Sequence, residues 1–103
     1  MMSRIINQKR YDTRTATCVA EYRNGPDFRS FFFVCERLYR KRTGEYFLHG
    51  SGEALSEYAQ HYSDHSFSGG EAIIPLTEDE ARQWCEQHCN ADEFEEIFGA
   101  VSE

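Results

Sequence analysis

The chain has 103 residues, of which 40% are hydrophobic and 15% aromatic, and its formal net charge is −7. This size suits a single domain, residues 1–103, built around one hydrophobic core. No apolar run is long enough for a signal peptide or a membrane span, so we expect a soluble, cytoplasmic protein without a membrane partner. The negative charge disfavours direct binding to nucleic acid.

The charge is divided unevenly along the chain. Residues 1–50 contain ten Lys and Arg and five acids, whereas residues 51–103 contain one Arg and thirteen acids. Asymmetry of this kind more often reflects a binding partner than a requirement of the fold. We therefore expect a function based on binding.

A hairpin and a short helix are expected at the N-terminus. Residues 5–11 have apolar ends around a polar centre, which predicts a hairpin that turns at Asn7-Gln8. Asp12 or the next residue can then cap a short helix within residues 13–20. Three threonines and a valine in this segment would also suit a strand, but we favour the helix.

The central part of the chain predicts a β-hairpin. Asn24-Gly25-Pro26-Asp27 indicates a turn, and residues 31–39 are bulky on both faces, as in a central strand. Residues 41–44 turn the chain, and residues 45–49 return as the partner strand. We expect this 31–48 hairpin to be the centre of an antiparallel sheet.

The segment after this hairpin predicts a helix, a loop and a strand. Ser51, between two glycines, can cap a helix in which Leu55, Tyr58, Ala59 and Tyr62 form one apolar stripe. Residues 63–70 are expected to form a polar loop. Residues 72–74 read as a short strand, and Pro75 favours an edge position or the strand's end.

Two helices are expected at the C-terminal end. Thr77 and Glu80 form a capping box, which predicts where the first helix begins. Apolar residues then recur at i, i+3, i+4 and i+7 on either side of a break near Asn90, and Gly99 can cap the second helix. We expect an α+β fold: a sheet of three or four antiparallel strands packed by three or four helices, two of them C-terminal.

Two groups of side chains could bind a metal. Cys85, His88 and Cys89 project from one side of a helix and could offer two thiolates and an imidazole to zinc. A fourth ligand would come from Cys18, Cys35, His61 or His65. His61 and His65 are also four residues apart, although a loop pair of this kind is usually solvated. The alternative is that Cys85 and His88 are ordinary inward-facing residues, and we expect no cofactor.

A hydrolytic site is a third hypothesis. His49-Gly50-Ser51-Gly52 stands at an expected strand-to-helix junction, where Ser51 could act as a nucleophile with His49 as its base, or backbone amides could cradle an anion. The motif matches neither a Walker loop nor a nucleophile elbow. A tight turn with a capping serine explains it more simply, and we do not expect an enzyme.

The acidic and basic clusters are the strongest binding candidates. Helix-start chemistry accounts for part of the acidic excess. The remainder could imitate nucleic-acid phosphates, as a DNA mimic does, or steer a basic protein partner. The acids expected to contact this partner are Glu86, Asp92, Glu93, Glu95 and Glu96, and the basic turn with Arg40, Lys41 and Arg42 is expected to be a second contact.

Three stretches of the chain carry a resemblance to known proteins. They are residues 5–13, residues 38–50 with the run Thr43-Gly44-Glu45-Tyr46-Phe47-Leu48-His49-Gly50, and residues 70–77 with Ile73-Ile74-Pro75-Leu76-Thr77. Together they resemble small proteins encoded on phages and conjugative elements of Gram-positive bacteria, and the resemblance spans nearly the whole chain. Some proteins of this type look like anti-CRISPR inhibitors of type II effector nucleases.

The resemblance implies a non-enzymatic interaction protein of a mobile genetic element, most plausibly an inhibitor that binds a CRISPR effector nuclease. It brings no catalytic or ligand residues with it. The alternatives are a small zinc-stabilised regulatory module and a small hydrolase.

Overall fold

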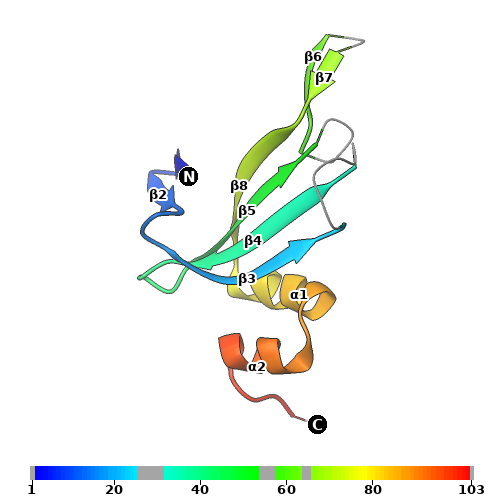
Figure 1. The fold of residues 1–103 in the computed structure, drawn as a ribbon. Coiled ribbons are helices and arrows are strands. Elements are labelled where there is room, and N and C mark those ends of the chain that lie inside the picture. Colours follow the sequence, from blue (N-terminus) through cyan, green and yellow to red (C-terminus); the bar gives the residue numbers. More distant parts are fainter. Residues whose placement is uncertain (1, 26–31, 54–57, 64–65, 103) are drawn as a thin grey trace.

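The fold is that of a computed structural model, which describes residues 2–25, 32–53, 58–63 and 66–102 (Figure 1). Its centre is an antiparallel sheet with the strand order β3-β4-β5-β8. These strands are β3 (Thr17–Arg23), β4 (Val34–Arg40), β5 (Tyr46–Gly52) and β8 (Gly70–Leu76). The expected central hairpin is confirmed as β4 and β5, which lie between two edge strands.

Two small hairpins and two helices complete the described residues. The hairpins pair β1 (Ser3–Ile6) with β2 (Lys9–Asp12), and β6 (Gln60–Ser63) with β7 (Ser66–Ser68). The helices are α1 (Glu78–His88) and α2 (Ala91–Phe98). The α+β class is confirmed, but the described residues contain two helices instead of three or four. Neither helix is long and apolar enough to cross a membrane.

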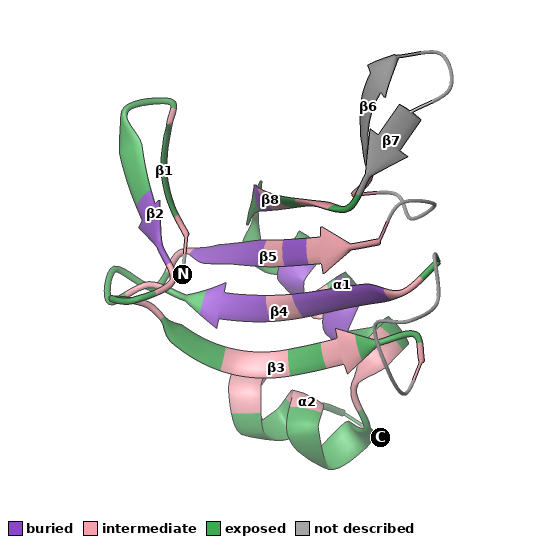
Figure 2. Ribbon diagram, turned by 45° about the horizontal axis from the view of Figure 1, so that its top comes forward, coloured by how far each residue is buried: buried purple, intermediate pink, exposed green. Residues whose placement is uncertain are grey.

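The sheet is the middle layer of the molecule, with the helices on one face and the β1–β2 hairpin on the other (Figure 2). Side chains alternate along a strand, so Leu38 and Leu48 pack toward α1 while Tyr39 and Phe47 pack toward the hairpin. Both faces are covered. This explains why β4 is apolar along most of its length.

The helix face forms the larger core cluster. Ala81, Trp84 and Cys85 of α1 are buried against Leu38 and Leu48 of the sheet. The apolar stripe of α2 packs on the edge of this cluster, although no residue of α2 is fully buried. The helix α1 is therefore part of the core, whereas α2 lies over it.

The opposite face has an aromatic cluster. The Tyr11 ring meets the edge of Phe47 at a centroid distance of 5.5 Å, and Tyr39 stacks on Phe47 at 5.1 Å. The Lys41 ammonium lies 3.6 Å from the centroid of the Tyr11 ring. These contacts hold the β1–β2 hairpin to the sheet.

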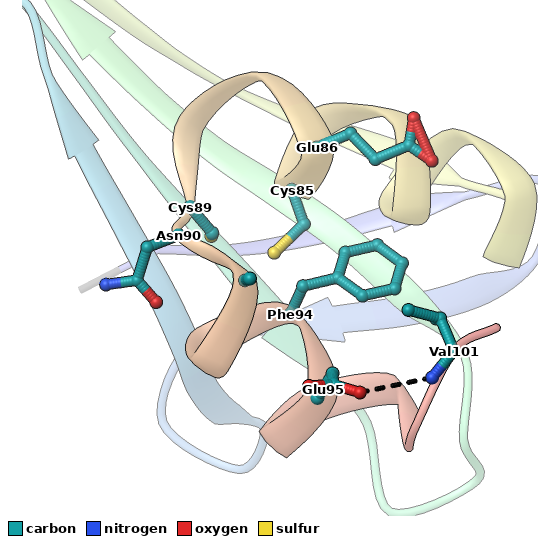
Figure 3. A pocket seen from close by; sticks show the side chains of 8 residues that line it. Cys85, Glu86, Cys89, Asn90, Phe94, Glu95 and Val101 are labelled. Atoms are coloured by element: carbon teal, nitrogen blue, oxygen red, sulfur yellow. Dashed lines mark hydrogen bonds between the residues drawn. The ribbon is translucent and has the colours of Figure 1, made fainter. Parts of the chain in front are cut away.

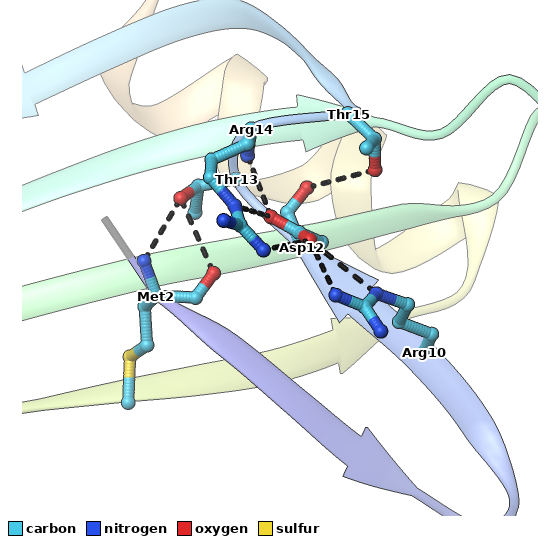
Figure 4. A network of polar contacts seen from close by, with 6 residues as sticks. All are labelled: Met2, Arg10, Asp12, Thr13, Arg14 and Thr15. Carbon is cyan, nitrogen blue, oxygen red and sulfur yellow. Dashed lines mark hydrogen bonds and ion pairs between the residues drawn. The ribbon is translucent and has the colours of Figure 1, made fainter.

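Buried carboxylates are satisfied on both faces of the sheet. Asp12 accepts hydrogen bonds from the guanidinium groups of Arg10 and Arg14 and from the Arg14 backbone N–H (Figure 4). On the helix face, Glu36 accepts hydrogen bonds from Trp84 Nε1, at 3.0 Å, and from the Tyr58 hydroxyl. Gly50 makes room for the second contact, because a Cβ at this position would clash with the Tyr58 ring.

Most of the local start and stop signals are confirmed. Asn7 and Gln8 turn the first hairpin at φ values of 51° and 66°, and Gly44 turns the central one at 92°. Thr77 caps α1 through the expected capping box. Gly99 ends α2 with a φ of 94°. Pro75 lies in β8, an edge strand, one residue before its end.

The helix expected within residues 13–20 is wrong, because residues 17–20 belong to β3. The β-branched threonines and valine favour a strand, and β4 supplies the backbone partners with which this strand pairs. The turn expected at 24–27 lies partly outside the described residues.

The helix expected after Ser51 is also wrong. Residues 54–57 lie outside the described part of the chain, but β5 continues through Ser51 and Gly52, and residues 60–63 form β6. The expected loop over 63–70 contains the strand β7. A four-residue apolar stripe was thus not enough to overcome hairpin pairing.

Candidate functional site

Ion pairs within the described residues engage most of the basic side chains in the N-terminal half of the chain. Six basic side chains pair with only three acids, namely Asp12, Glu21 and Glu45, and the basic members are Lys9, Arg10, Arg14, Arg23, Arg37 and Lys41. The hydrogen bonds that Asp12 accepts from Arg14 and Arg10 hold the pKa of its carboxyl well below the usual range. Six of the ten N-terminal basic side chains are thus engaged inside the fold, but three acids balance the charge of only three of them, so this half of the chain stays basic.

Several helix acids also have structural roles. Glu78 pairs with Arg82 at 3.1 Å, and Glu80 and Glu93 complete the capping boxes of α1 and α2. Glu95 accepts a hydrogen bond from the Val101 backbone N–H at 3.1 Å. The sequence reasoning missed the second capping box, although Asn90 and Glu93 have the same spacing as Thr77 and Glu80.

The remaining helix acids point to solvent. Asp79, Glu86, Asp92 and Glu96 are exposed, and none of them forms an ion pair within the described residues. Glu96 is one helical turn after Asp92, so both lie on the same side of α2. The outward surface of α1 and α2 therefore keeps its negative charge.

The three basic residues near the central turn are in different surroundings. The Lys41 side chain is only 12% exposed, because it lies over Tyr11 and pairs with Glu45 at 3.6 Å. Arg42 is exposed at the turn. Arg40 instead lines a hollow of about 270 Å³ together with Glu93 and Glu96 of α2. The structure brings Arg40, and not Lys41, to the acidic helix.

A second, more apolar hollow lies between the two helices (Figure 3). It has a volume of about 430 Å³ and is lined by Cys85, Glu86, Cys89, Asn90, Ala91, Phe94, Glu95 and Val101. The Phe94 ring lies between Cys85 and Val101 in this view. Burial raises the pKa of the Cys85 thiol to about 12, and the thiol therefore stays protonated and neutral.

The proposed zinc ligands do not converge on one point. Cys85 faces this hollow, where Cys89 is its hydrogen-bond partner. The His88 ring does not line this hollow. Its centroid lies 3.9 Å from that of the Tyr22 ring and 5.0 Å from that of the Trp84 ring. No group of three His, Cys, Asp or Glu side chains placed to hold a metal occurs in the part of the chain that the structure describes.

The other candidate ligands are also dispersed. Cys18 is exposed on β3, Cys35 is buried in β4, and His61 is in β6. His65 lies outside the described residues.

His49 and Ser51 both belong to β5, two residues apart, so their side chains share the face opposite the helices. His49 Nε2 lies 2.8 Å from Glu71 Oε2, and no hydrogen bond joins His49 to Ser51. Ser51 is therefore a strand residue beside a His–Glu pair, with neither the cap nor the sharp turn that we expected.

Comparisons with protein-family models, curated proteins and solved structures found no match to this chain.

Proposed function

We propose that this chain is a non-enzymatic interaction protein that binds a basic protein partner through the outward surface of α1 and α2. The observation that carries the proposal is the exposure of Glu86, Asp92 and Glu96 without an ion pair, within the described residues. The class to test first is an inhibitor of a type II CRISPR effector nuclease, to which the resemblance points.

The distribution of ion pairs supports this proposal. Solubility depends on the net charge and does not require acidic and basic side chains to lie on different surfaces. Here Asp12, Glu21 and Glu45 pair with Lys and Arg of the sheet and its hairpin, whereas Glu86, Asp92 and Glu96 of the helices have no ion pair within the described residues. An acidic surface without ion pairs raises the association rate of a basic partner and disfavours the binding of acidic partners.

Arg40 refines the second contact. Arg40 lines the same hollow as Glu93 and Glu96, so a partner that binds α2 would also contact Arg40. Arg42 is exposed at the central turn, whereas Lys41 is already engaged with Tyr11 and Glu45. The proposed surface therefore includes Arg40 and Arg42 as its basic members.

The test is a plasmid-interference assay with a type II effector, followed by direct binding to the purified effector. The test variant carries Glu86→Lys and Glu96→Lys, which leave the capping residue Glu93 and the hydrogen bond of Glu95 intact. We expect this variant to lose inhibition and to bind at least about tenfold more weakly. Binding by the wild type should weaken as salt rises.

The matched control carries Ser3→Lys, Gln8→Lys and Glu71→Lys, which together change the net charge by the same amount at exposed positions of β1, its turn and β8, away from α1 and α2. It should inhibit like the wild type. Equal inhibition by the test variant would contradict the acidic surface as the binding site. If the wild type neither inhibits nor binds, the assignment to this inhibitor class is wrong for the effectors tested.

A further inference from the structure

The hollow between α1 and α2 combines an apolar interior with acids at its sides. Cys85, Phe94 and Val101 supply apolar surface, and Glu86 and Glu95 line the same hollow (Figure 3). Val101 is 53% exposed, so part of this apolar surface is accessible to a partner. The hollow is open to solvent, and its volume of about 430 Å³ is large enough for one apolar side chain.

The chemistry of the walls restricts what this hollow can bind. Burial keeps the Cys85 thiol neutral, so the interior does not favour a charged group. The carboxylates of Glu86 and Glu95 disfavour an acidic neighbour and favour a cation beside the entrance. An apolar side chain that enters the hollow would therefore be accompanied by Lys or Arg on the same partner.

We infer that the hollow between α1 and α2 is an anchor site, which receives one apolar side chain of a protein segment whose neighbouring residues are basic. This inference rests on the proposed function and adds an apolar anchor to it. Binding energy at interfaces is usually concentrated where an apolar side chain fills a pocket, while the surrounding charges set orientation and partner choice.

The experiment uses three short peptides and the full chain labelled with ¹⁵N. In the first peptide a single leucine is flanked on both sides by lysines. The second replaces this leucine with serine, and the third replaces the lysines with glutamates. We expect the first peptide to shift the amide signals of Ala91, Phe94 and Val101, and the serine peptide to bind about tenfold more weakly because its side chain gains no apolar burial.

A variant pair tests the hollow itself. Ala91→Leu fills the hollow without changing the charge, and Ala100→Leu adds the same side chain at an exposed position outside it. The first should weaken binding of the leucine peptide about tenfold, and the second should leave it unchanged. Circular dichroism checks that both variants keep their helices.

The outcomes separate this inference from the proposed function. If the leucine and serine peptides bind equally well and the glutamate peptide does not bind, the acidic surface stands and the anchor site is wrong. If the lysine and glutamate peptides bind equally well, the acidic surface is not a binding site for basic partners, and the anchor inference, which requires basic neighbours, is wrong with it. If the chain forms dimers, and dilution shifts these amide signals without any peptide, the occupant is a second copy and the anchor inference is overturned.

Discussion

Asp12 and Glu36 are the charged residues with buried side chains among the described residues, and each accepts hydrogen bonds from different partners. Asp12 is surrounded by two guanidinium groups, whereas Glu36 accepts only neutral donors from Trp84 and Tyr58. The two guanidinium groups carry fixed positive charge, so their ion pairs with Asp12 are lost when its carboxyl is protonated. Asp12 is therefore the residue whose contribution to stability should change most with acid.

The first prediction concerns Asp12. The carboxyl pKa is lower in the folded chain than the unfolded value of about 3.9. Ionisation of Asp12 therefore stabilises the fold fully above about pH 4, and this stabilisation is lost as the pH falls below that value. Urea unfolding followed by Trp84 fluorescence should give an Asp12→Asn variant with a lower midpoint at pH 7 and a weaker decline between pH 4 and 2.

The control for this prediction is Asp92→Asn, because Asp92 is exposed and has no ion pair within the described residues. Its midpoint should follow the pH profile of the wild type. If Asp12→Asn shows the same acid decline as the wild type, another carboxyl determines the acid sensitivity of the fold.

At the scale of elements, local chemistry predicted the turns and helix starts but not every choice between helix and strand. Asn7, Gln8, Gly44 and Thr77 act through their own backbone and nearest neighbours, so the sequence identifies them. Residues 17–20 and 60–63 became strands because neighbouring strands pair with them. Such pairing depends on a partner strand outside the segment, distant for β3 and next along the chain for β6, and the periodicity of one segment does not report it.

The second prediction concerns the cap of α2. This helix has eight residues, none of them buried, so its stability depends strongly on local interactions. Asn90→Ala removes the side chain that accepts from the Glu93 backbone N–H at 2.8 Å and should destabilise α2 by about 1 kcal/mol. Hydrogen exchange should then be faster for the amides of residues 91–98, while the sheet amides keep their rates.

The matched control is Thr77→Ala, which removes the equivalent cap of α1. Trp84 and Cys85 anchor α1 in the core, so its amides should stay protected until the whole chain unfolds. Equal local exchange in the two variants would contradict the view that α2 is held mainly by its own capping box.

At the scale of the whole molecule, the candidate surface was harder to predict than the fold class. The helix acids are visible in the sequence as a cluster, but capping and ion pairs remove some of them from a binding role. Only the packing of α1 and α2 places Arg40 beside Glu93 and forms the hollow next to Phe94. Neither feature follows from residue spacing, because the first joins β4 to a helix distant along the chain and the second depends on how two consecutive helices pack.

The two faces of the sheet share β4 and β5, so a change on one face should affect the other. Tyr11 is buried against Phe47, whose strand neighbours Tyr46 and Leu48 face α1. Tyr11→Ala should lower the free energy of unfolding by about 3 to 5 kcal/mol, since it removes a buried aromatic ring and exposes its neighbours. Ile5→Ala is the control, because Ile5 is 66% exposed in the adjacent strand and should change this free energy by less than about 0.5 kcal/mol.

The readout for Tyr11→Ala should come from both faces. Trp84 fluorescence reports the helix face, and far-ultraviolet circular dichroism reports all secondary structure. If the sheet couples the two cores, both probes should move to the same lower urea midpoint in one transition. A Trp84 transition that stays at the wild-type midpoint, while part of the dichroism is lost earlier, would instead show that the β1–β2 hairpin unfolds as a separate unit.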